Sequence, residues 1–359
     1  MKSLRSLFNH AIGLASAASC FASTDAHLSP PTEDGCVGPW FTGPLLAPAG
    51  HTIPPRYINV EPYMFYTVTT GMYDADWKVT NLPNFTSVNF QMLLYIGITK
   101  RFDIQFAPQA NWNQTENVSS LEFGDFAAEL DYQFIENESH PETPAVKLYL
   151  RESFPTGRYQ RLDPERRLTD SGGSGSFEST LGFVVTATYE FPGCHFLNWR
   201  LNGYVTLPTH VDVKGVNTYG GAPNTEANIR PGITWGGIFA LQYNITEHWA
   251  LSVDLEGLYA KATTFKGFAG TEIANSSPPI PLGNPSNASF SIAPAIEYNF
   301  NASVGIIAGA WVTFAGRNTP HFYSGVIAIN YFGPLGEGSA RKNRTRGGSG
   351  GSAGGGGGR

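Results

Sequence analysis

Charged side chains at alternate positions of two neighbouring runs are the residues of this 359-residue chain best placed to do chemistry. Asp125, Glu129 and Asp131 belong to the first run, and Lys147 and Arg151 belong to the second. Alternate residues of a β-strand point to one face, so two adjacent antiparallel strands would set a row of acids against a row of bases. Such rows give a transverse electric field that can orient a solute. The simpler interpretation is that the charges pair with each other and stabilise the wall.

Covalent catalysis has little support in the sequence. A serine hydrolase needs a nucleophile, a histidine base and a third polar residue that orients the base. The glycines between Gly172 and Gly175 open no helix and form no nucleotide-binding motif, and no metal-ligand spacing is present. The histidines occur in the lead-in segment, in loops or at strand ends, without a nucleophile pattern: His51, His140, His195, His210, His248 and His321. We therefore predict no enzymatic activity, no cofactor and no metal site, with a lipid-degrading barrel as the enzymatic alternative.

The elements that position the charged residues are strands of period two. From Val88 to Ile98 apolar residues alternate with mostly polar ones, and the alternation restarts from Phe102 to Phe106 after a tight turn. This pattern predicts two long antiparallel strands. In a membrane the apolar row of each strand faces lipid and the polar row faces a lumen.

The end of the first strand of this hairpin recurs along the chain. Similar tyrosine-containing endings close four later runs, at Tyr132, Tyr189, Tyr243 and Tyr298. Counting the runs gives an even total of twelve strands, as bacterial single-chain barrels require. Short turns follow these endings, whereas a loop is expected from Thr70 to Pro83 and longer ones at Phe154 to Phe177, Thr206 to Ile233 and Tyr259 to Phe290.

These patterns define the fold class that we predict. It is all-β, a transmembrane antiparallel up-and-down β-barrel with short periplasmic turns and long extracellular loops. A soluble β-sandwich with an aromatic core is the alternative. The composition agrees with a barrel, because 41% of residues are hydrophobic, 14% are charged and 13% are aromatic, yet no apolar run approaches the length of a spanning helix.

The expected location is the bacterial outer membrane, with lipid, lipopolysaccharide and a small-molecule solute as partners. A net charge of −6 argues against nucleic acid as a partner. The sequence does not define the oligomeric state. The alternative function is that of an adhesin or structural barrel acting through its long loops, of which the stretch from Arg158 to Asp170 carries the most charge.

We divide the chain into four parts. Residues 1–22 have the basic start and short apolar stretch of a signal peptide, although Cys20 would also suit a lipoprotein. Residues 23–55, rich in proline and glycine, are expected to form an irregular periplasmic lead-in or plug segment. Residues 56–332 are the predicted barrel, and residues 333–359 are a flexible Gly/Arg-rich tail or a tag.

Three motifs within the predicted barrel resemble those of one known family. They are the run from Gly124 to Tyr132, the strand end Pro155-Thr156-Gly157, and the glycine-rich run from Asp170 to Phe177. In this order they are similar to motifs of the outer-membrane channel family named after the meta-pathway of phenol degradation. The resemblance covers roughly Tyr57 to Phe332 and implies a transporter or porin-like channel for small, often aromatic, molecules. Asp131 stands where that family usually has a basic residue.

If the apolar rows face lipid, twelve charged side chains face the lumen. They comprise nine acids and three bases, an excess of negative charge that favours cations or neutral solutes over anions. We therefore expect a channel for passive or facilitated diffusion of small cationic or neutral solutes, including aromatic ones. The predicted lumen-facing residues are Glu61, Asp103, Asp125, Glu129, Asp131, Lys147, Arg151, Glu190, Arg200, Asp254, Glu256 and Glu297.

Two further predictions concern the periplasmic side. A barrel of twelve strands has a passage of intermediate width, which a short segment can close. The candidate plug residues are Trp40, Phe41, Leu45, Leu46 and Pro48. Cys36 and Cys194 both belong on this side and are a candidate disulfide in an oxidising compartment, or else two unrelated thiols.

Overall fold

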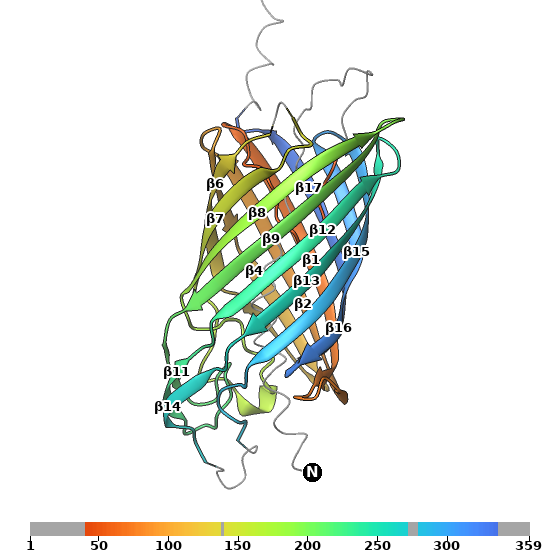
Figure 1. Ribbon diagram of the computed structural model, residues 1–359. Helices are drawn as coiled ribbons and strands as arrows, with labels where there is room; N and C mark the ends of the chain where they lie inside the picture. Colours follow the sequence, from red (N-terminus) through yellow and green to blue (C-terminus); the bar gives the residue numbers. More distant parts are fainter. Residues whose placement is uncertain (1–39, 138–139, 272–278, 337–359) are drawn as a thin grey trace, which may run out of the picture.

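The computed structural model describes residues 40–137, 140–271 and 279–336. The predicted signal peptide, the start of the lead-in segment and most of the C-terminal tail lie outside the described residues. The described chain forms a 14-stranded sheet that closes on itself, because its first strand, β1, also pairs with β2 (Figure 1). All neighbouring strands that close the wall are antiparallel.

Two wall strands are each interrupted once. β3 (Phe102–Ala107) and β4 (Gln109–Thr115) both pair with β2 and form one strand broken at Pro108. β5 (Val118–Phe123) pairs with β4 and β6 (Phe126–Ile135) pairs with β3, so they form a second strand broken at Gly124 and Asp125. Counted in this way, the closed barrel has the predicted twelve strands. The other wall strands are β1 (Tyr57–Tyr73), β2 (Val79–Gly97), β7 (Ala145–Phe154), β8 (Glu178–Phe191), β9 (His195–Pro208), β12 (Thr234–Asn244), β13 (Trp249–Ala260), β15 (Asn287–Asn301), β16 (Val304–Arg317) and β17 (Thr319–Pro334).

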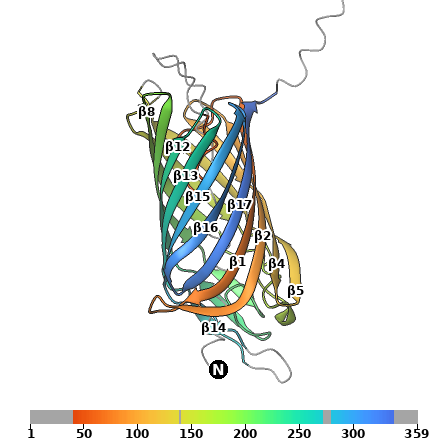
Figure 2. The ribbon, with the colours of Figure 1, turned by 90° about the vertical axis from the view of Figure 1, so that its right-hand side faces the viewer.

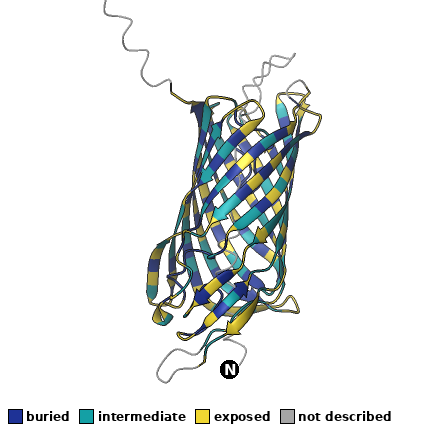
Figure 3. Ribbon diagram, turned by 90° about the vertical axis from the view of Figure 1, so that its left-hand side faces the viewer, coloured by how far each residue is buried: buried dark blue, intermediate teal, exposed yellow. Residues whose placement is uncertain are grey.

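The alternation seen in the sequence becomes an inside and an outside. On β2, Gln91 and Leu93 are buried, whereas Phe90 and Met92 on the opposite face are 49% and 43% exposed. The same alternation of buried and exposed residues runs along the strands around the wall (Figure 3). A barrel with an apolar outer face and buried polar groups inside matches the transmembrane class, because a lipid-facing wall requires apolar side chains and a fully paired backbone.

The two ends of the barrel differ. Short turns join the strands at one end, and the other end carries three long connections (Figure 1). These connections contain the 3₁₀ helix η1 (Pro164–Arg166) and a separate three-stranded sheet of β10 (Val211–Lys214), β11 (Glu226–Arg230) and β14 (Thr264–Phe268). The sequence did not predict this small sheet, because its strands are only four or five residues long.

The prediction of a loop from Thr70 to Pro83 is wrong. β1 and β2 continue as a paired ladder to Tyr73 and Val79 (Figure 2), and β17 pairs with β1 over the same length, with Thr319 opposite Tyr73. The pairing register shifts between Thr69 and Gly71, which leaves Pro83 outside the Cα pairs of the ladder. Proline is tolerated at such a bulge because it has no N–H to donate.

Among the described residues, no helix is long and apolar enough to cross a membrane.

Candidate functional site

The interior of the short-turn end is filled by the segment that precedes β1, which we call the inner segment (residues 40–55). Residues 41–50 are all buried. Leu45, Leu46 and Ile53 belong to an apolar cluster with inward side chains of the wall, among them Tyr95 and Ile307. An irregular segment buried in this way must find partners for its backbone N–H and C=O groups.

Carboxylates from three wall strands accept those N–H groups. Glu297 on β15 accepts from the Thr42 N–H at 2.8 Å. The two oxygens of Asp254 on β13 accept from the N–H groups of Leu45 and Ala47, each at 3.0 Å. On the opposite side, Asp103 on β3 accepts from the Ile53 N–H at 2.5 Å. The acids that were predicted as sources of a lumen field therefore also serve as acceptors for a buried backbone.

Donor side chains satisfy the carbonyl groups of the same segment. The Arg200 guanidinium on β9 donates to the carbonyl oxygens of Ala47 and Pro48, each at 3.3 Å. Gln133 on β6 both accepts from the Thr52 N–H at 2.9 Å and donates to the Gly50 carbonyl at 3.2 Å. Side chains from five strands thus replace the hydrogen bonds that a neighbouring strand would supply.

The remaining predicted plug residues lie at the start of the inner segment. Phe41 packs against Phe196 and Ala250. The Trp40 carbonyl accepts from the Asn299 amide at 2.6 Å, and the Trp40 ring lies 5.3 Å from that of His248.

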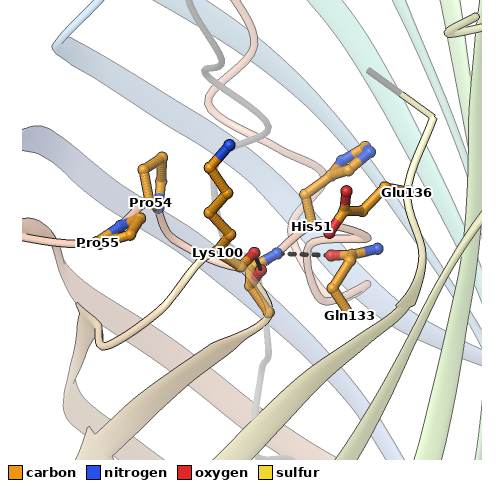
Figure 4. Close-up of a pocket in the computed structure, with 7 residues that line it drawn as sticks. His51, Pro54, Pro55, Lys100, Gln133 and Glu136 are labelled. Atoms are coloured by element: carbon orange, nitrogen blue, oxygen red, sulfur yellow. Dashed lines mark hydrogen bonds between the residues drawn. The ribbon is translucent and has the colours of Figure 1, made fainter. Parts of the chain in front are cut away.

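A small cavity of about 130 Å³ lies where the inner segment meets the rim (Figure 4). His51, Pro54 and Pro55 line it from the segment, and Lys100 and Glu136 line it from two neighbouring turns. Thr52 and Gln133 also line it, and the hydrogen bond from the Thr52 N–H to Gln133 joins them (Figure 4). The cavity is large enough for a few water molecules.

The facing rows of acids and bases lie on β6 and β7. Glu129 is directly opposite Arg151, and their charged atoms are 3.8 Å apart. Lys147 forms an ion pair with Asp131 at 3.1 Å diagonally across the two strands, since Tyr149 is directly opposite Asp131. These four side chains are at most 5% exposed, so the two strands carry a buried ladder of charges.

The other predicted lumen residues are placed as follows. Glu61 is buried and accepts from the amides of Asn59 at 2.7 Å and Asn330 at 2.6 Å. Glu256 is half-buried and accepts from the Ser291 hydroxyl at 2.8 Å. Glu190 is exposed, because it lies in the part of the β8–β9 hairpin that projects past β7 at the short-turn end (Figure 2).

Asp125 lies at the other end of the lumen, in the break between β5 and β6. Its carboxylate accepts from the N–H of Gly157 at 2.9 Å, the N–H of Ser174 at 2.7 Å and the Ser174 hydroxyl at 3.1 Å. It thereby ties both ends of one long connection, residues 155–177, to the wall. Tyr219 from the next connection donates to the Ser174 carbonyl at 2.7 Å, and burial raises the pKa of this phenol well above 10.0.

Cys194 lies just before β9 and is disulfide-bonded. Cys36 and Cys20 lie outside the described residues. The pairing of Cys36 with Cys194 stays a prediction.

Uncharged amides were missed by sequence reasoning. Gln133, Asn299 and Asn244 make buried hydrogen bonds to backbone groups, yet they carry no charge to attract notice. The usable signal was the alternation itself, since each of these amides occupies an inward position of its strand. An amide that points into the lumen can bind a buried backbone group just as an inward acid can.

The closed antiparallel barrel with an apolar outside and a charged inside defines the class, a β-barrel of the outer-membrane type. The model of the family described as "Putative MetA-pathway of phenol degradation" matches residues 65–329, and the chain belongs to that family. This match confirms the family suggested by the Gly-Asp, Pro-Thr-Gly and glycine-rich motifs. A comparison with curated proteins gave no match.

The chain is similar to several solved structures at low sequence identity. An outer membrane channel from Pseudomonas putida F1 is similar with a TM-score of 0.60 and 14% identity, over 79% of this chain and 97% of that chain. The NanC porin gives a TM-score of 0.41 and 7% identity, over 76% of this chain and 98% of that chain. The β-domain of the Bordetella autotransporter BrkA gives 0.42 and 8%, over the same two shares, 76% and 98%.

Proposed function

We propose that the protein is an outer-membrane channel for the diffusion of small solutes and not an enzyme. The observation that carries this proposal is the distribution of side chains on the wall. Apolar side chains lie on the outer face, and buried ion pairs such as Lys147–Asp131 lie on the inner face. Such a wall is stable in lipid and offers a polar path through it. Export through a signal in residues 1–22 belongs to the same proposal, and the N-terminal sequence of the mature protein tests it.

The balance of lumen charge supports a preference for cations and neutral molecules. Nine of the twelve predicted lumen residues are acidic, and ten of the twelve are buried. Hydrogen bonds from the inner segment spread the charge of Asp103, Asp254 and Glu297 without cancelling it. A negative field inside low-dielectric walls raises the local concentration of cations. Neutral solutes, including aromatic ones, belong to the same proposal, because a negative field does not repel them.

The inner segment acts as a constriction in this proposal. It is buried from residue 41 to residue 50 and is bound by side chains from β3, β6, β9, β13 and β15. A passage that remains beside it is narrower than the barrel itself. Selection by size and charge therefore takes place at the short-turn end.

Planar-bilayer recordings of the purified protein in a tenfold KCl gradient test the function. We expect discrete conductance steps and a reversal potential whose sign shows a preference for K⁺. Glu129→Gln should reduce the preference and Arg151→Gln should increase it. Anion preference would contradict the lumen assignment, and the absence of conductance in both the full chain and a variant lacking residues 37–52 would contradict the channel.

A further inference from the structure

Two carboxylates stand face to face inside the barrel, at the inner segment. Asp103 on β3 is directly opposite Asp131 on β6, and both are at most 1% exposed. The Cβ atoms of directly opposite residues lie about 5 Å apart, and like charges in that position are destabilising. Such a pair needs positive charge close by.

Several acceptor atoms around this pair are without hydrogen bonds. Within the described chain, no hydrogen bond is made to Asp103 Oδ1, Asp131 Oδ2 or Glu129 Oε2, and Asp131 Oδ1 has only the ion pair with Lys147 at 3.1 Å. Gln105 is 1% exposed, and neither its amide oxygen nor its amide nitrogen has a hydrogen-bond partner in the described residues. The register sets Gln105 between Tyr95 and Glu129 on the same inward face. Buried polar atoms are nearly always hydrogen-bonded in proteins, so a group of free acceptors indicates an occupant.

The charges of the cluster do not balance, and one further positive charge would neutralise it. Its three carboxylates, Asp103, Glu129 and Asp131, are accompanied by two bases, Lys147 at 3.1 Å from Asp131 and Arg151 at 3.8 Å from Glu129. One negative charge therefore remains. Among the described residues, no group of three or more metal-binding side chains has the geometry to hold a metal ion. The missing partner must supply one positive charge and several donors.

We propose that Asp103, Gln105, Glu129 and Asp131 form a binding site for the primary ammonium group of a small solute. An ammonium group carries a single charge and three N–H donors, which matches the free acceptors, and hydrogen bonds to carboxylates are strengthened by charge. The site rests on the proposed function, since it lies on the solute path. It narrows the expected cationic solutes to amines.

Block of K⁺ current by propylammonium chloride tests the site in planar bilayers. Tetramethylammonium has the same charge without an N–H donor, and 1-propanol has similar size without charge. We expect propylammonium to block at roughly tenfold lower concentration than tetramethylammonium, because charge-assisted hydrogen bonds are lost in the latter. Propanol should not block.

Matched variants locate the effect. Gln105→Leu should weaken block several-fold, whereas Gln91→Leu, which removes a buried amide from the neighbouring strand β2, should not. Glu129→Gln should weaken block about tenfold. Glu247→Gln removes the same charge from an exposed turn and should have no effect.

A second readout does not require conduction. Propylammonium should raise the unfolding temperature of the detergent-solubilised full chain, through preferential binding to the folded state, and the Gln105→Leu variant should lose this shift. Equal stabilisation by tetramethylammonium or Na⁺ would contradict an ammonium site and indicate a general cation field. No stabilisation by any cation would mean that a proton shared by Asp103 and Asp131 replaces the ligand. Loss of conductance with the temperature shift retained would refute the channel but not the site.

Discussion

At both ends of the lumen, side chains of the wall bind the backbone of an irregular segment, but the number of strands that supply them differs. At the short-turn end, side chains from five strands bind the backbone of the inner segment, and at the long-loop end Asp125 binds the backbone of residues 155–177 at two points. A buried carboxylate that accepts N–H groups is stabilising in both places. The anchors of the inner segment are spread over five strands, whereas Asp125 alone accepts N–H groups from both ends of residues 155–177, with Asn113 binding the carbonyl groups between them. A single substitution at Asp125 should therefore loosen its connection more than a single substitution loosens the inner segment.

Removing the inner segment is expected to have the largest effect. Deletion of residues 37–52 should raise single-channel conductance severalfold. Residues 41–50 are buried within the lumen, so their removal should widen the open cross-section of the barrel. A variant lacking residues 337–359 is the control for a shortened chain. Unchanged conductance after the first deletion would contradict the proposed constriction, since the segment would then not restrict the passage.

Asp125→Ala should have the next largest effect, and it acts at the other end. The N–H groups of Gly157 and Ser174 would lose their common acceptor, at a cost of roughly 3 kcal/mol. Limited trypsin digestion should then cleave after Arg161, Arg166 or Arg167 about a hundredfold faster than in the wild type. Asp125→Asn keeps one acceptor oxygen and should show an intermediate rate.

Gly172→Ala tests the fit of the same connection without touching its charge. A Cβ at Gly172 would lie 2.3 Å from the Phe123 carbonyl oxygen, so the connection must move away from β5 at a cost of about 1 to 3 kcal/mol. Gly325→Ala on β17 is the matched control, because nothing lies within 4 Å of its added Cβ. Equal trypsin sensitivity in the two variants would show that the connection is not packed against β5.

Asp254→Asn should have a smaller effect, because the short-turn end has other anchors. Glu297, Asp103 and Gln133 would still hold the segment, and we expect conductance to rise less than it does after the deletion. A rise as large as that of the deletion would mean that the anchoring depends on one residue. Glu247→Gln in the exposed turn is the charge-matched control.

The smallest expected effect is that of pH on Tyr219. The pKa of this phenol is raised well above its ordinary value of 10.0 by burial, so the folded loop favours the neutral form. Its contribution to stability is therefore constant below pH 10 and falls as pH rises above 10, where the unfolded tyrosine ionises first. Trypsin protection of residues 155–177 should decline above pH 10 in the wild type and stay flat in Tyr219→Phe.

The wall of the barrel could be predicted from sequence because alternation fixes which residues face out. The runs ending at Tyr132, Tyr189, Tyr243 and Tyr298 gave the strands and their short turns. The small sheet at the long-loop end could not be predicted, because its strands are only four or five residues long and β14 pairs with a strand about 40 residues earlier, with Phe268 opposite Glu226. The sequence also gave no sign that Asp254 and Glu297 accept backbone N–H groups, since the segment that donates them has no periodicity.

Hydrogen exchange of the inner segment is the most direct test of the account. The N–H groups of Thr42, Leu45, Ala47, Thr52 and Ile53 each donate to a wall side chain. Mass spectrometry of peptides covering residues 40–53 should therefore show protection comparable to that of the wall strands. Exchange as fast as in an unstructured peptide would contradict the claim that the lumen binds its own N-terminal segment.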